Sequence, residues 1–95
     1  MIELNSYIRH REELLTQVAS DTLVIFNLDD GQYYALEGVG GKIWELCDGT
    51  NTAAEVISAL CEEYNAPYET VEKDVLVILE ELVYEKLAVE CNERA

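Results

Sequence analysis

The pattern of apolar and polar residues changes once along the chain, near Gly38, and the two parts predict different secondary structure. Before Gly38, short segments rich in β-branched and aromatic residues alternate with turn residues, which is typical of β-strands. We expect strands over residues 14–18, 22–28 and 32–36, with a hairpin turn at 29–31, because Asp and Gly tolerate the positive φ angles of tight turns. The predicted sheet is a three-stranded antiparallel meander with 32–36 at one edge.

After Gly38, apolar residues recur at helical spacing, and the sequence predicts three helices. The first helix covers about residues 42–47. The second is capped by Thr50 or Thr52, and Glu55, three residues after Thr52, can complete a capping box; the helix ends before Pro67.

The third predicted helix runs from Thr70, its expected N-cap, to about Lys86, and residues 87–89 can add a short extended segment. One apolar stripe follows this helix and consists of Val71, Val75, Ile78, Leu79 and Leu82, with Leu76, Val83 and Leu87 on one flank and Val77 and Tyr84 well off it. This arc is wider than one core stripe needs. Either the helix is sandwiched between the sheet and the other helices, or part of the arc lines a groove for a partner.

Three strands followed by three helices predict an α+β fold, in which a three-stranded antiparallel sheet precedes a three-helix winged-helix-like bundle. The 95 residues are expected to form one domain, 1–95, with its core over about 14–90. A chain of this length buries about 60–65% of its unfolded surface, which argues against a large enzyme with an enclosed active site.

The charge of the chain narrows the classes of partner. Twenty acidic and 6 basic residues give a formal net charge of -14, which repels phosphate backbones and anionic lipid. A basic peptide or a basic protein face is therefore a better partner than nucleic acid or a membrane. The N-terminal residues lack the basic and apolar regions of a signal peptide, and we expect a cytoplasmic protein.

Catalytic and metal-binding residue types are few. Cys47, Cys61 and Cys91 are odd in number and widely spaced, which predicts free thiols rather than disulfides or a zinc site. His10 lies in a polar segment and is expected in solvent, and the glycines of 38–41 lack the remaining residues of a phosphate-binding loop and are expected to form a flexible connection. We expect no catalytic residue, no metal and no cofactor, and therefore no enzyme.

The edge strand is the most informative feature for function. Residues 32–36 contain neither Lys nor Pro, the residues that commonly keep an edge from pairing with another chain. An open edge beside an apolar helix suits β-strand addition, in which main-chain bonds give affinity and pockets give specificity. The predicted peptide site comprises Gln32, Tyr33, Tyr34, Ala35 and Leu36 on the strand and Asp74, Val75, Ile78, Leu79, Glu81 and Leu82 on the helix. A loop or a second copy that covers the edge is the competing interpretation.

Three segments carry a resemblance to a known family. They are residues 34–50 (YALEGVGGKIWELCDGT), 52–57 (TAAEVI) and 75–82 (VLVILEEL). Together they resemble the pyrroloquinoline quinone biosynthesis protein D family, the small recognition domains for ribosomally made, post-translationally modified peptides. The resemblance covers about residues 14–90, and it departs from the family pattern at Glu37, where members often have Asn.

The resemblance implies a three-stranded sheet on a winged-helix-like bundle that binds the leader of a precursor peptide as an added strand. It also implies that the leader lies against the third strand and the third helix and is delivered to a maturation enzyme. We favour a leader peptidase of lasso-peptide biosynthesis as that enzyme, with a radical S-adenosylmethionine enzyme as the alternative. A winged-helix transcriptional regulator and a small enzyme are the alternatives of other classes.

Overall fold

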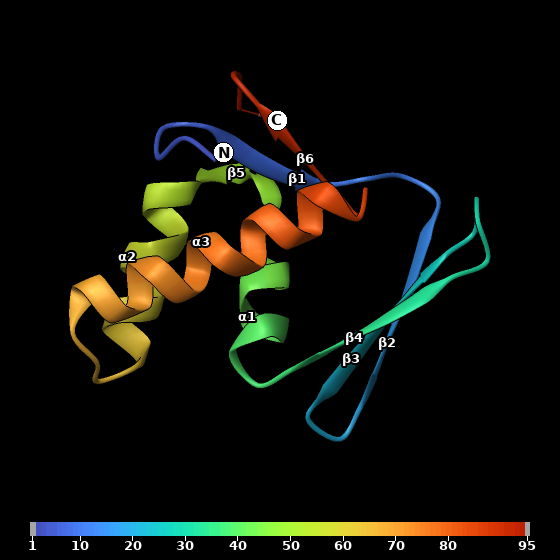
Figure 1. Ribbon diagram of the computed structural model, residues 1–95, viewed down its shortest axis with the longest axis horizontal. Helices are drawn as coiled ribbons and strands as arrows, with labels where there is room; N and C mark the ends of the chain where they lie inside the picture. The colour runs from blue at the N-terminus through green and yellow to red at the C-terminus, as the bar shows by residue number, and fades with distance from the viewer. Residues whose placement is uncertain (1, 95) are drawn as a thin grey trace.

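The computed structural model describes residues 2–94, which form two three-stranded antiparallel sheets and three helices (Figure 1). In chain order the elements are β1 (Tyr7–His10), β2 (Leu14–Ala19), β3 (Thr22–Asn27), β4 (Tyr33–Glu37), α1 (Val39–Leu46), β5 (Asp48–Thr52), α2 (Ala53–Glu63), α3 (Tyr68–Tyr84) and β6 (Ala88–Cys91). In Figure 1, α3 crosses α1 and α2, while the sheet of β2, β3 and β4 stands to one side of the helices. The predicted α+β class is confirmed.

The predicted meander is present, with strand order β2-β3-β4 and β4 at one edge. Ile25 lies opposite Tyr34, and Leu23 lies opposite Leu36, so the buried face of β3 continues onto β4. The predicted turn closes the second hairpin, where the Gly31 N–H donates to the Asn27 carbonyl at 2.9 Å and Gly31 has a φ of 75°.

The second sheet, of order β5-β1-β6, corrects the prediction of one sheet followed by helices. Residues 7–10 looked like a polar segment, yet they form the central strand β1 and bury Ile8 completely. The strand β5 directly precedes α2. Of the three strands of this sheet, only β6 corresponds to an extended segment that was predicted, at 87–89. These strands have four or five residues and come from three distant parts of the chain, so no local pattern reveals their pairing.

The helix α1 begins at Val39, earlier than predicted, and includes Gly40 and Gly41, which were expected to belong to a flexible connection. Gly40 is buried against Leu36, and a Cβ at Gly40 would lie 3.3 Å from the Leu36 Cβ. The glycine therefore allows α1 to pack closely on the end of β4. Gly38, with a φ of 55°, makes the sharp turn from strand to helix.

The helix caps agree with the prediction at α2 and differ at α3. At α2, the Thr52 side chain accepts the Glu55 N–H at 3.1 Å and the Glu55 carboxylate accepts the Thr52 N–H at 2.8 Å, which confirms the capping box. At α3 the predicted cap at Thr70 is wrong, because Pro67 is the N-cap. The Pro67 carbonyl accepts the N–H groups of Thr70 and Val71, each at 3.1 Å. Proline suits a helix start because its fixed φ and missing N–H cost nothing there.

The core lies where α3 packs on the rest of the molecule. Four residues of the predicted stripe are buried, namely Val71, Val75, Leu79 and Leu82, and they join Ile43, Trp44, Val56, Ile57 and Leu60 from the other helices. Ile78, also in the predicted stripe, is half-buried, and Val77 and Tyr84 are exposed as their positions off the stripe suggest. The stripe thus serves the core, and a neighbouring row of α3 remains free for other contacts.

Substitutions of Thr52, which caps α2, and of Thr70, which was predicted to cap α3, should have different effects on stability. Replacing Thr52 by Ala removes the side-chain acceptor of the Glu55 N–H, while the backbone N–H of residue 52 remains able to donate to the Glu55 carboxylate. The loss of this one bond should lower the free energy of unfolding by about 1 kcal/mol. Replacing Thr70 by Ala, the matched control, should change it by less than about 0.5 kcal/mol, since the Thr70 side chain makes no capping bond and alanine keeps the N–H that donates to Pro67. Urea denaturation of both variants measures the difference, and equal losses would contradict the cap assignment.

Candidate functional site

The strand β4 has a free edge whose backbone groups can be assigned from the register. The Asn27 N–H donates to the Gln32 carbonyl at 2.8 Å, so this opposed pair is hydrogen-bonded. Bonded and non-bonded pairs alternate in an antiparallel ladder, so Tyr34 and Leu36 direct their backbone groups to β3. By the same alternation, the N–H and C=O groups of Tyr33, Ala35 and Glu37 point away from the sheet.

A groove of about 100 Å³ lies between this edge and α3. It is lined by Tyr34, Ala35, Leu36, Ile78, Glu81, Glu85, Leu82 and Leu87. The structure thus brings together six of the residues named from the sequence and adds two, Glu85 and Leu87. Glu85 was missed because its role depends on Tyr34, which lies 51 positions away, and Leu87 was seen only as the flank of a stripe.

The Tyr34 hydroxyl closes one end of the groove. It donates to the Glu85 Oε2 at 2.6 Å and lies 3.1 Å from the Gln32 Oε1. The hydrogen bond to the Glu85 carboxylate, together with desolvation, raises the pKa of Tyr34 to about 12. This bond joins the edge strand to the C-terminal end of α3 and fixes the width of the groove there.

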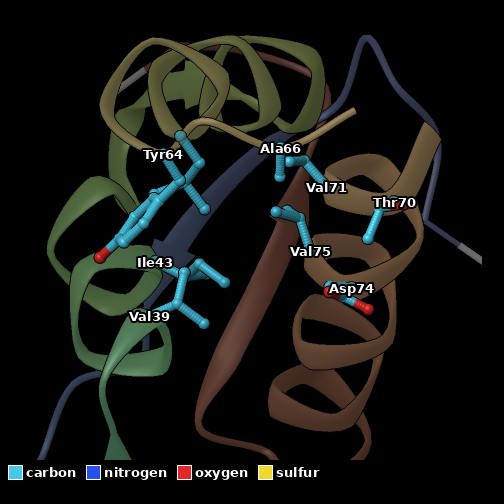
Figure 2. A pocket seen from close by; sticks show the side chains of 9 residues that line it. Val39, Ile43, Tyr64, Ala66, Thr70, Val71, Asp74 and Val75 are labelled. Atoms are coloured by element: carbon cyan, nitrogen blue, oxygen red, sulfur yellow. The ribbon is translucent and has the colours of Figure 1, made fainter. Parts of the chain in front are cut away.

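A second cavity of about 210 Å³ lies further along α3, toward its N-terminal end (Figure 2). Its lining residues come from α1, α2, α3 and the segment between α2 and α3: Val39, Ile43, Leu60, Tyr64, Ala66, Thr70, Val71, Asp74 and Val75. Figure 2 shows Val39 and Ile43 facing Val75 and Val71 across the cavity, with Asp74 on the α3 side. The cavity is therefore apolar and has one carboxylate beside it.

The two hollows follow one face of α3. At 100° per residue, the α3 residues that line them fall within one sector of the helix, and from Thr70 to Glu85 the helix rises about 22 Å. Seven residues of an extended chain span about the same length. The arrangement offers a strand edge, an apolar floor and acidic margins to one extended segment.

The remaining predicted site residues lie elsewhere. Leu79 is completely buried in the core. Tyr33 is 70% exposed, on the face of the sheet opposite to Ile25. Gln32 is exposed directly before β4 and does not line the groove, although its side chain lies beside the Tyr34 hydroxyl. Asp74 and Val75 belong to the second cavity rather than to the groove beside β4.

Candidate chemical groups outside the groove are engaged in packing. His10, expected in solvent, is half-buried, because its ring stacks on Trp44 with centroids 3.7 Å apart and its Nε2 donates to the Trp44 carbonyl. The cysteines are free thiols, as predicted, and burial raises the pKa of the Cys47 thiol to about 12. Within residues 2–94, no three His, Cys, Asp or Glu side chains are grouped to hold a metal ion.

No helix formed by residues 2–94 combines the length and the apolar character required to cross a bilayer.

Comparison with known proteins places these features in a family context. The family model of coenzyme PQQ synthesis protein D (PqqD) matches residues 22–88, which include β4, α1 and α3. The PqqA binding protein of Gluconobacter oxydans (strain 621H) is 41% identical over 49 residues. That alignment covers 52% of this chain and 51% of the relative, so the match spans about half of each protein.

Two solved structures share the fold. TbiB1, solved in complex with the TbiA(beta) leader peptide, has a TM-score of 0.77 and 29% identity, over 84% of this chain and 93% of the other. A lasso peptide synthetase B1 complexed with its leader peptide has a TM-score of 0.75 and 24% identity, over 86% and 96% of the two chains. The second likeness concerns the fold alone.

The Tyr34–Glu85 bond should be visible in a tyrosine titration. Ultraviolet absorbance of the six tyrosines should include one group that ionises near pH 12, and Tyr34→Phe should remove it. Glu85→Gln should move that ionisation toward 10, because the amide carries no negative charge. The unfolded chain releases this proton near pH 10, so the contribution of Tyr34 to stability is complete below pH 10 and lost as pH rises to about 12. A titration curve that Tyr34→Phe leaves unchanged above pH 11 would contradict the assignment.

Proposed function

Because the chain belongs to the coenzyme PQQ synthesis protein D family, as its sequence motifs predicted, we propose that it binds the leader segment of a ribosomally made precursor peptide as a strand added to β4. The free backbone edge of β4 beside α3 is the observation that carries this proposal. The single domain 1–95 acts as a peptide-recognition protein, and its action lies in the cytoplasm, where precursor peptides are made.

Main-chain pairing supplies the general part of the affinity. The outward groups of Tyr33, Ala35 and Glu37 can form about six hydrogen bonds with an added strand, each contributing about 0.5–1.5 kcal/mol net. Ordering a flexible peptide costs about 2–5 kcal/mol. Pairing alone therefore gives weak binding, and side-chain contacts along α3 must supply the rest.

The second cavity gives the leader an anchor. An apolar cavity of about 150 Å³ holds a benzene-sized group, so the cavity of about 210 Å³ admits an aromatic or large aliphatic side chain. Asp74 beside this cavity and Glu81 beside the groove favour Lys or Arg next to the anchor. In this proposal the added strand contacts five of the predicted site residues: Gln32, Tyr33, Tyr34, Ala35 and Leu36. The side chains of the leader contact Asp74, Val75, Ile78, Glu81 and Leu82 on α3, and Leu79 supports these residues from the core.

The protein delivers the leader and does not itself catalyse a reaction. Two observations support the leader-binding part of this role: TbiB1 was solved in complex with a leader peptide, and the related protein of Gluconobacter oxydans is named for binding PqqA. As the enzyme that receives the leader, we propose a leader peptidase of lasso-peptide biosynthesis, which the resemblance of the sequence motifs favours. A winged-helix regulator is disfavoured, because the exposed side of α3 carries acidic residues such as Asp74, Glu80 and Glu81 that repel DNA.

The isolated protein should bind a synthetic peptide that covers the leader of its own precursor, without any enzyme present. Isothermal titration calorimetry should give a dissociation constant between about 0.01 and 10 μM. A peptide with the same composition in scrambled order is the control and should bind at least about tenfold more weakly, since it misplaces the anchors. Absence of heat up to about 100 μM leader would overturn the proposed function.

Proline substitutions test the edge directly. Ala35→Pro removes an outward N–H and should abolish leader binding while circular dichroism stays native. Ala35→Val retains that N–H and should bind normally, and Tyr34→Pro removes an N–H that pairs with β3 and should damage the sheet itself. If Ala35→Pro folds and binds as the unmodified protein does, the leader docks elsewhere.

A further inference from the structure

The sheet of β2, β3 and β4 has an apolar outer face that the groove does not use. Leu23, Ile25 and Asn27 of β3 are buried toward the helices, so Val24 and Phe26 point to the opposite face. Leu15 lies opposite Phe26, and Phe26 lies opposite Tyr33, so these three form a row across all three strands. Their exposed fractions are 58%, 38% and 70%. An outer sheet face is ordinarily polar, and such an exposed apolar row is typical of an interaction surface.

The charges around this face indicate what can cover it. Residues 12–41 contain six acidic side chains, Glu12, Glu13, Asp21, Asp29, Asp30 and Glu37, and all 6 Lys and Arg of the chain lie outside this range. A second copy of the chain would place six acidic groups against six others. Like charges within a Debye length of about 8 Å repel, so the electrostatics favour a partner with a basic margin.

The outer face is also continuous with the proposed leader site. Tyr33 and Ala35 present their side chains on this face, and their backbone groups form the free edge. A leader paired with β4 becomes the fourth strand of the same sheet and extends the face by one strand. A protein that rests on the outer face would therefore touch the leader and the sheet together.

We propose that the outer face of the sheet, centred on Leu15, Phe26 and Tyr33, docks the enzyme that processes the bound leader, through an apolar surface of that enzyme with a basic margin. This proposal rests on the proposed function, because it assigns the leader to the adjacent edge. The leader and the enzyme thus use two sides of one strand, β4. The groove can then remain occupied while the enzyme engages the complex.

The test uses the full chain, a synthetic leader and a purified leader peptidase from the same organism as the chain. The variant Leu15→Thr with Phe26→Thr removes the apolar centre and retains residues that favour strands. It should weaken enzyme binding by at least about tenfold in biolayer interferometry while its calorimetric affinity for the leader stays within about twofold. The control is Val18→Thr, which alters an equally exposed residue of β2 on the inner side of the sheet and should change neither value.

Binding of the enzyme by the unmodified protein should also weaken as salt rises, because the margins attract by charge. Thermal unfolding checks that the double variant is folded, and Leu15→Thr alone replaces it if it is not. If the variants bind the leader normally and their affinity for the enzyme is also unchanged, this inference is overturned and the proposed function remains. Loss of leader binding in the unmodified protein would overturn both. Sedimentation that shows a dimer abolished by the double variant would assign the face to a second copy and overturn the inference.

Discussion

The rotation of α3 about its own axis is the constraint on which the rest of the structure depends. Val71, Val75, Leu79 and Leu82 are buried, and a helix has 3.6 residues per turn, so their burial determines the direction of every other side chain of α3. The row that includes Asp74, Ile78, Glu81 and Glu85 is thereby turned toward β4 and α1. The packing of the core and the shape of the groove are therefore both determined by the rotation of α3. A change that rotates the helix would disturb both.

Each end of α3 is held by a different kind of contact. At its start, the Pro67 carbonyl accepts two N–H groups of the first turn. At its end, Lys86 adopts a φ of 63° and leads directly into β6, which pairs with β1, while Glu85 accepts the Tyr34 hydroxyl. The second sheet therefore holds the C-terminal end of α3, and the Tyr34–Glu85 bond sets its distance from the edge strand.

Local patterns were sufficient for the parts of the fold whose partners are close in sequence. The meander, its hairpin turn, the capping box at Thr52 and the buried stripe of α3 were all predicted, because each is encoded within a few residues. The second sheet was missed because β1 gains its partners only when the chain folds back, and Arg9 and His10 make it look like a solvated segment. His10 was misplaced for the same reason, since its stacking partner Trp44 is remote. The candidate groove was found from the open edge and the wide apolar arc, whereas Glu85 and the second cavity depend on distances that no single segment contains.

The pairing of β1 with β6 has a consequence for the order in which the protein assembles on the ribosome. The hairpins of β2, β3 and β4 join neighbouring segments, and such local structure forms quickly. The strand β1 is made first but must wait for β6, the last strand, before its ladder is complete. During that interval the nascent chain carries an open β4 edge without the acidic helix that later flanks it. Residues 12–41, with acidic side chains and no basic ones, keep such emerging chains apart while the wall of the groove is still being synthesised.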